Sequence, residues 1–109
     1  MTFAQIQARL EEIDADLLTR TPKLERAAKD YFTVKRDYER AKSEAYLKTT
    51  GTVGEREAAT VLALWKADAY KSLVVAEADY EAQKAVIRVL ETRASIGQSL
   101  LRVQRETGG

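Results

Sequence analysis

Six residues between positions 35 and 48 combine the two kinds of side chain that bind single-stranded nucleic acid. Cations attract phosphates, and an aromatic ring offers a face on which an unpaired base can stack. Lys35 and Lys42 are seven residues apart and share one helical face, while Arg36 and Arg40 lie on a neighbouring face. The candidate nucleic-acid-binding residues are Lys35, Arg36, Arg40, Lys42, Tyr46 and Lys48.

The same cations have a structural alternative. Acidic residues follow Arg36, Arg40 and Lys42 closely along the chain, and oppositely charged side chains three or four residues apart on a helix can pair. An acidic helix packed against this stretch would serve the same purpose. The acidic neighbours within the stretch are Asp37, Glu39 and Glu44.

Other kinds of chemistry have little support. The chain contains no cysteine and no histidine, so it lacks thiolate ligands and the side chain that most often acts as a general base near neutral pH. Carboxylates such as Glu11, Glu12 and Asp14 are spread around a helix and cannot all converge on one ion. We therefore expect no catalytic residue, no metal site, no cofactor and no enzymatic activity.

Apolar residues that recur at steps of three and four predict an all-α chain. A stripe from Phe3 to Leu17 defines a first helix, and a stripe of alanines and tyrosines defines a second. Thr21 and Pro22 form a cap followed by a first-turn proline, so we expect a break there. The expected elements are helices over about residues 3–19, 22–49 and 53–105, with a turn at residues 50–54.

The turn at residues 50–54 organises these helices. Gly51 can take the positive φ that ends a helix, and Thr52 with Glu55 three residues later fits a capping box at the next helix start. Folding back at this turn predicts a long antiparallel, coiled-coil-like hairpin whose first arm is broken at Pro22. We expect it to form one helical domain over residues 1–109.

The distribution of charge agrees with such a hairpin. Residues 20–50 carry nine basic and five acidic groups, and they would face residues 51–82, which carry three basic and six acidic groups. Residues 1–19 carry one basic and four acidic groups and would face residues 83–109, with five basic and two acidic groups. Each segment meets one of opposite net charge, which favours this pairing.

The last expected helix carries more apolar surface than a two-helix seam uses. A second stripe lies about 100° around the helix from the first. Another chain, or the first helix wrapping round, would cover it. We expect a homo-oligomer, either a ring or a bundle. The candidate oligomer interface consists of Val86, Val89, Ile96, Leu100 and Val103.

The sequence predicts no membrane partner. No stretch approaches the roughly 20 apolar residues that span a bilayer, and acidic residues from Glu11 onward interrupt any signal-like run. Residues 83–109 mix acidic groups among their cations, unlike a helix that lies on a membrane. The formal net charge is +1, so attraction to nucleic acid must come from a local patch. We expect a soluble intracellular protein.

Two stretches resemble the UvsY-type recombination mediators of bacteriophages. The family's basic-aromatic signature has the form Lys-Ala-Arg-Leu-Asp-Tyr-Tyr before a Gly-containing loop, and residues 40–46, Arg-Ala-Lys-Ser-Glu-Ala-Tyr, occupy the same place here. The cations are exchanged, Ser43 stands in place of the leucine, and Ala45 in place of one tyrosine. Residues 93–104 resemble the family's Lys-Ser-Arg-Gly stretch and the amphipathic segment that follows it.

The resemblance implies a ring-forming homo-oligomer that binds single-stranded DNA and helps a recombinase or annealing protein displace single-strand-binding protein. Its setting would be the cytoplasm of a phage-infected bacterial cell. Arg40 and Lys42 would hold phosphates, Tyr46 would stack on a base, and the C-terminal helix would build the ring. The alternative is a structural or adaptor coiled-coil protein that binds only other proteins and whose charges serve helix pairing.

Overall fold

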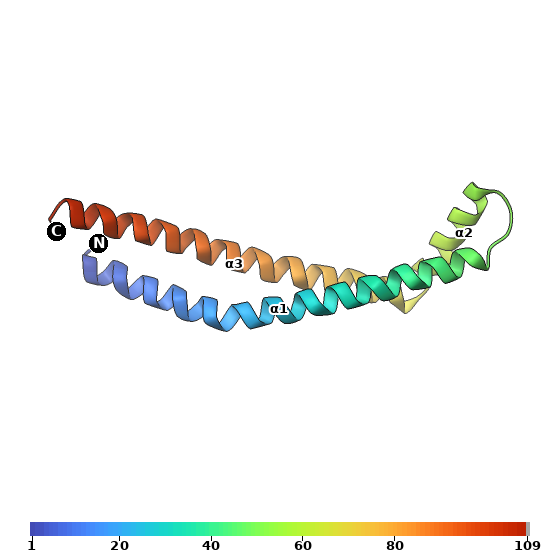
Figure 1. The fold of residues 1–109 in the computed structure, drawn as a ribbon, viewed down its shortest axis with the longest axis horizontal. Helices are drawn as coiled ribbons and strands as arrows, with labels where there is room; N and C mark the ends of the chain where they lie inside the picture. Colours follow the sequence, from blue (N-terminus) through green and yellow to red (C-terminus); the bar gives the residue numbers. More distant parts are fainter. Residues whose placement is uncertain (109) are drawn as a thin grey trace. The chain divides into compact units, whose positions relative to one another are not determined.

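The computed structural model describes residues 1–108 and is built of helices (Figure 1). The helices are α1 (Phe3–Leu47), α2 (Val53–Trp65) and α3 (Asp68–Glu106). No strand occurs among the described residues, which confirms the all-α class. None of the helices in residues 1–108 is long and apolar enough to cross a membrane.

The expected break at Pro22 is wrong, because α1 continues through this residue. A proline in a helix interior removes one backbone hydrogen bond and costs about 3 kcal/mol. Packing on both sides offsets this cost, since Ile6 before the proline and Ala27 after it are each only 3% exposed. The carbonyl that lacks its helical donor because of Pro22 is that of Leu18, and the Thr21 hydroxyl donates to the preceding carbonyl, that of Leu17, at 2.7 Å.

The helix expected over residues 53–105 is also interrupted, between Trp65 and Asp68. Here the Ala67 N–H donates to the Leu64 carbonyl at 3.1 Å, a spacing of three residues instead of four. No glycine or proline marks the place, and only Lys66, a polar residue within an apolar stripe, sets it apart in the sequence. The chain therefore has two helices where the apolar pattern predicts one.

The positive φ of Gly51 and the Thr52 cap predicted for the turn are confirmed, but α1 ends at Leu47, four residues before Gly51, and α2 already begins at Val53. Gly51 has a φ of 111°, in the region that favours glycine. Thr52 caps α2, and its hydroxyl accepts a hydrogen bond from the Glu55 N–H at 3.2 Å. A local signal in the sequence thus describes a local structure correctly.

The contacts divide the chain into two compact units. Unit 1 contains Met1–Glu25 and the residues from Ala82 on, and unit 2 contains Arg26–Glu81. α1 and α3 each contribute to both units. The expected single domain over residues 1–109 stays a prediction.

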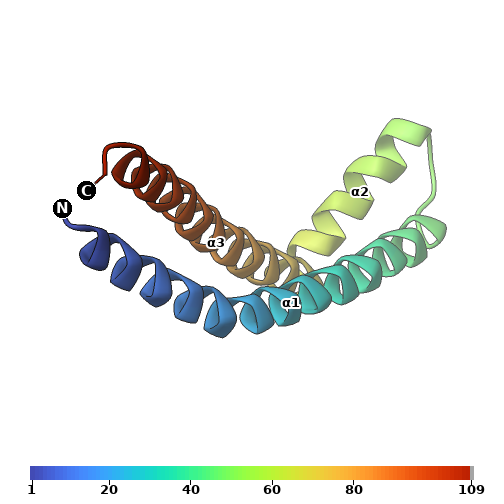
Figure 2. The ribbon, with the colours of Figure 1, turned by 60° about the vertical axis from the view of Figure 1, so that its left-hand side comes forward.

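In unit 1 the start of α1 packs antiparallel to the end of α3, and the two ends of the chain lie side by side (Figures 1 and 2). The Gln104 side chain donates to the Met1 carbonyl at 2.8 Å. Further along, Gly97 lies so close to Leu10 that a Cβ on the glycine would come within 2.6 Å of a leucine methyl. The buried residues of this unit are Ile6, Ile87 and Leu90.

In unit 2 an aromatic seam joins the second part of α1 to the beginning of α3. Tyr31 stacks on Tyr80 at a centroid distance of 5.3 Å, and Tyr38 lies 6.4 Å from Tyr70. The alanine and tyrosine stripe predicted for this part of α1 is buried or half-buried along its length. On α2, Thr60 and Leu64 are the buried residues.

Candidate functional site

The predicted cations lie on the surface of unit 2. Lys35, Arg36, Arg40 and Lys42 are exposed on α1, and Lys48 is exposed just after its end. None of them forms an ion pair with any residue among 1–108. Pairing with acidic neighbours, the structural alternative for these cations, is therefore not what their side chains do in the structure.

Tyr46, the predicted stacking residue, is occupied within the chain. The Arg56 guanidinium lies over its ring, 4.1 Å from the centroid. The same group donates from Nε to the Thr49 hydroxyl and from Nη2 to the Tyr46 carbonyl, both at 3.1 Å. The ring face that Arg56 covers is not open to a base, and the arrangement ties the start of α2 to the end of α1.

Sequence reasoning missed Arg56 because its contact crosses the turn. Ten residues separate it from Tyr46, and no periodic pattern connects a helix end with the second turn of the next helix. The charge of Arg56 in an otherwise acidic stretch, between Glu55 and Glu57, is the signal that points to a specific role. We infer that Arg56 stabilises the turn by holding the start of α2 against the end of α1, and we call this set of contacts the Arg56 latch.

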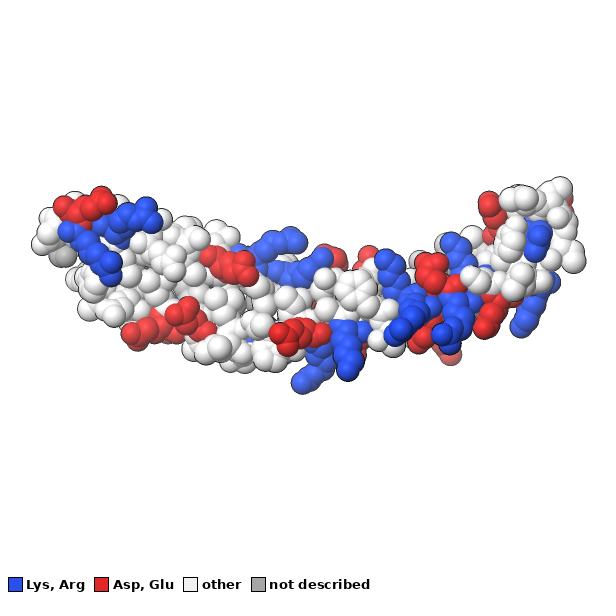
Figure 3. Space-filling view, in the orientation of Figure 1, with Lys and Arg blue, Asp and Glu red and all other residues white. Residues whose placement is uncertain are grey.

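The basic face of α1 extends further than the predicted residues. Arg26 and Lys29 are exposed on the same helix, and with Arg36 and Arg40 they follow steps of three, seven and four residues, which place them on one side of α1. This stripe covers about 21 Å at 1.5 Å per residue. Figure 3 shows Lys and Arg side chains gathered over this part of α1, with Asp and Glu side chains among them.

The charges of unit 2 are sorted between its helices. Residues 26–48 contain seven basic and four acidic groups, whereas residues 49–81 contain three basic and six acidic groups. The first segment is the α1 side of the unit, and the second comprises α2 and the beginning of α3. Unit 2 thus presents a net positive side on α1, although its total charge is balanced.

The predicted oligomer interface lies on α3 in unit 1 and is open to solvent. Val89, Ile96, Leu100 and Val103 are all exposed, while Val86 is half-buried. α1 therefore does not wrap round to cover this stripe. The apolar surplus expected for α3 is present, and the oligomer itself stays a prediction.

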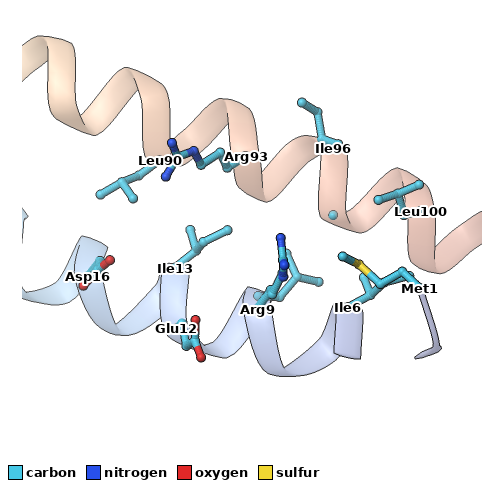
Figure 4. A pocket seen from close by; sticks show the side chains of 12 residues that line it. Met1, Ile6, Arg9, Glu12, Ile13, Asp16, Leu90, Arg93, Ile96 and Leu100 are labelled. Atoms are coloured by element: carbon cyan, nitrogen blue, oxygen red, sulfur yellow. The ribbon is translucent and has the colours of Figure 1, made fainter. Parts of the chain in front are cut away.

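A groove of about 780 Å³ lies between α1 and α3 of unit 1 (Figure 4). Ile13 and Arg9 point from α1 toward α3, and Ile96 points away from α1. Apolar side chains from both helices line the groove, together with charged groups of both signs. The charged lining residues are Arg9, Glu12, Asp16 and Arg93.

Comparisons with protein-family models, with curated proteins and with solved structures found no match. The resemblance to UvsY-type mediators therefore stays a hypothesis carried by residues 40–46 and 93–104. Among residues 1–108, no three acidic side chains are grouped so that they could hold a metal ion. The described residues offer a basic face on α1, an apolar stripe on α3 and a smaller apolar surface on α2.

Proposed function

We propose that this chain is a non-enzymatic protein that binds single-stranded DNA through the basic face of α1. The observation that carries the proposal is the set of exposed cations on this face that have no ion-pair partner within residues 1–108. Like charges held close together on one helix repel each other. A strand of phosphates supplies the missing counter-charge and releases its own counterions in exchange.

Self-association through α3 is the second part of the proposal. Val89, Ile96, Leu100 and Val103 form an exposed apolar stripe, and contiguous exposed apolar patches commonly mark protein interfaces. Several copies joined in this way would place several basic faces along one strand. Binding sites linked in one particle reach a higher overall affinity than any one of them alone.

The proposed architecture is one long antiparallel hairpin. Contacts within each unit support it, since they join early residues to late ones in the order that folding back at Gly51 requires. In unit 1 the Arg105 guanidinium lies 6.0 Å from the Phe3 ring centroid. In unit 2 Tyr31 stacks on Tyr80.

The biological setting follows from the resemblance alone. A UvsY-type mediator helps a recombinase or annealing protein displace single-strand-binding protein, in the cytoplasm of a phage-infected bacterial cell. We propose the same partners and setting for this chain, with residues 40–46 in the position of the family's basic-aromatic signature.

Fluorescence anisotropy tests the DNA-binding proposal. A labelled dT20 oligonucleotide is titrated at low salt with the wild type and with the Arg40→Ala/Lys42→Ala variant. We expect the variant to bind several-fold more weakly, because it loses two phosphate contacts. Lys66→Ala/Lys71→Ala is the matched control, since it removes two exposed cations outside α1. Equal weakening in both double variants would show that total charge, and not the basic face of α1, determines binding.

An adaptor that binds only proteins is the second candidate. Its specific support is the apolar surface of α2, where Val61, Leu62 and Trp65 are all more than half exposed. Such a protein would assemble, or bind a partner protein, without affinity for DNA. This candidate would be favoured over the first if the protein sediments as an oligomer and the anisotropy of labelled dT20 does not change when the protein is added.

A further inference from the structure

Phe32 is an aromatic ring that the fold supports on one side and leaves open on the other. Its centroid lies 5.2 Å from that of Tyr31 and 5.8 Å from that of Tyr80, in tilted and edge-on contacts. These two tyrosines stack on each other and form part of the seam of unit 2. Phe32 nevertheless remains 54% exposed. The tyrosines hold the ring in place, so binding to its open side would cost little side-chain entropy.

Three exposed cations surround this ring on α1. Lys29 is three residues before Phe32, and Lys35 and Arg36 are three and four residues after it. Residues at these spacings are neighbours on a helix, with Cβ atoms about 5–6 Å apart. The remaining neighbour at four residues is Ala28, which is small and uncharged. No acidic residue stands at any of these four positions around the ring.

The cations around Phe32 are available to a ligand. None of the three forms an ion pair with another residue in the described part of the chain. The Lys35 ammonium is the most restricted of them, because it lies 5.8 Å from the Tyr31 ring centroid. Lys29 and Arg36 also belong to the stripe that continues to Arg26 and Arg40, so a strand that contacts Phe32 can follow the stripe in both directions.

We propose that Phe32 is the residue on which an unpaired base of single-stranded DNA stacks, with its phosphates on Lys29, Lys35 and Arg36. A single strand offers an apolar base face next to a negative charge, which matches an open ring among cations. In a duplex the base faces are already stacked on their neighbours. A protein partner fits less well, since the centres of protein interfaces are depleted in charged residues.

This inference rests on the proposed function and assigns the stacking role to a residue outside the basic-aromatic signature. Tyr46, the aromatic residue of that signature, has Arg56 on its ring at 4.1 Å. Phe32 lies two helical heptads before Tyr46 and has no such cover on its open side. Its apolar ring accepts every base face, so the site predicts little sequence preference.

The test compares two oligonucleotides that differ only in their bases. One is dT20, and the other is a chain of equal length in which abasic sites replace all the thymidines, so that both carry the same phosphates. We expect the wild type to prefer dT20, and Phe32→Leu to lose roughly tenfold in affinity for dT20 while its affinity for the abasic chain is unchanged. Phe32→Tyr keeps a ring and should keep the preference. Trp65→Leu, which removes an exposed ring on α2, is the matched control and should also keep it.

The outcomes separate this inference from the proposed function. A wild type that binds neither oligonucleotide overturns the proposed function. If the wild type prefers dT20 and Phe32→Leu retains that preference, DNA binding stands and the stacking assignment is wrong. If Trp65→Leu, and not Phe32→Leu, loses the preference for dT20 over the abasic chain, the base stacks on α2 and the assignment to Phe32 is wrong. Poly-glutamate that competes as well as dT20 would show a general polyanion site, against the proposal.

A second measurement uses the wild type alone, in case Phe32→Leu does not fold. An oligonucleotide that contains 5-iodouracil is photo-crosslinked to the protein, and the modified residue is identified by peptide mass spectrometry. We expect the crosslink at Phe32. Crosslinks confined to Tyr46 or Trp65 would overturn the assignment.

Discussion

The outer face of α1 in unit 2 and the outer face of α3 in unit 1 differ in what they offer to solvent. Both helices bury a stripe that follows the same steps of three and four residues. Outside that stripe α1 exposes cations such as Arg36 and Arg40, whereas α3 exposes Ile96 and Val103. The inner faces account for helix pairing, and under the proposed function the outer faces bind partners, a polyanion on α1 and an apolar surface on α3.

The core of the chain is thin. Among the residues that the structure describes, no side chain of any size is less than 2% exposed. Two helices packed along a seam bury little apolar surface for their length. Burial of the α3 stripe by a second copy would therefore add substantially to the stability of the chain, at about 25 cal/mol per Å² of apolar surface.

The largest expected effect comes from placing a charge on each outer face in turn. Ile96→Glu/Val103→Glu puts two carboxylates on the α3 stripe, and burying them in an interface would cost several kcal/mol. We expect this variant to sediment as a monomer at tens of micromolar, and the wild type to sediment there as an oligomer. Its affinity for an oligonucleotide short enough to contact a single basic face should change little, because only the gain from linked binding sites is lost.

The complementary change places a carboxylate on α1. Thr33 is exposed on the same side of α1 as the basic stripe, and Thr33→Glu adds a carboxylate there. We expect weaker binding of dT20 and an unchanged oligomer. If both variants lose assembly, or both lose DNA binding, the division of roles between the two faces is wrong.

A smaller effect is expected from the latch in unit 2. Arg56→Met keeps a long side chain but removes the two hydrogen bonds of the guanidinium and its contact with the Tyr46 ring. We expect a loss of about 2 kcal/mol in the free energy of unfolding, measured by urea denaturation. Lys66→Met, at an exposed position, is the control. Equal stability of the two variants would contradict the latch.

The smallest effect is expected in unit 1, at the contact of Gly97 with Leu10. A Cβ at residue 97 meets the end of the leucine side chain at 2.6 Å, and nothing lies within 4 Å of a Cβ at Gly54. Alanine gains roughly 1 kcal/mol over glycine in a helix interior, which is where Gly97 lies. We expect Gly97→Ala to gain less than this in thermal unfolding because of the Leu10 contact, with Gly54→Ala in the first turn of α2 as a control that has no such contact. A full gain at residue 97 would show that Leu10 leaves room there.

Much of the fold could be predicted from the sequence, because its determinants are local. The buried stripe of α1 follows from apolar spacing, and the turn follows from Gly51 and Thr52. The continuity of α1 through Pro22 could not be predicted, since packing of distant residues offsets the cost of the proline. The end of α2 at Trp65 has no strong local signal either.

The candidate site also depends in part on contacts between residues that are distant in the sequence, and these could not be predicted. The residue types of the basic face can be read from the sequence, but whether Arg36 or Arg40 pairs with an acid depends on three-dimensional placement. The exposure of Phe32 and the cover over Tyr46 likewise depend on contacts between helices. Sequence patterns identify which helix carries a surface, and packing decides which of its side chains remain open.

Binding of single-stranded DNA by the basic face of α1 is tested by the salt dependence of dT20 binding to the wild type. If the basic face of α1 contacts about four phosphates, the logarithm of the binding constant should fall with the logarithm of salt concentration with a slope of about −3. An unlabelled duplex of the same length should compete poorly. Absence of binding at micromolar protein and low salt, or binding that salt does not weaken, would contradict the account.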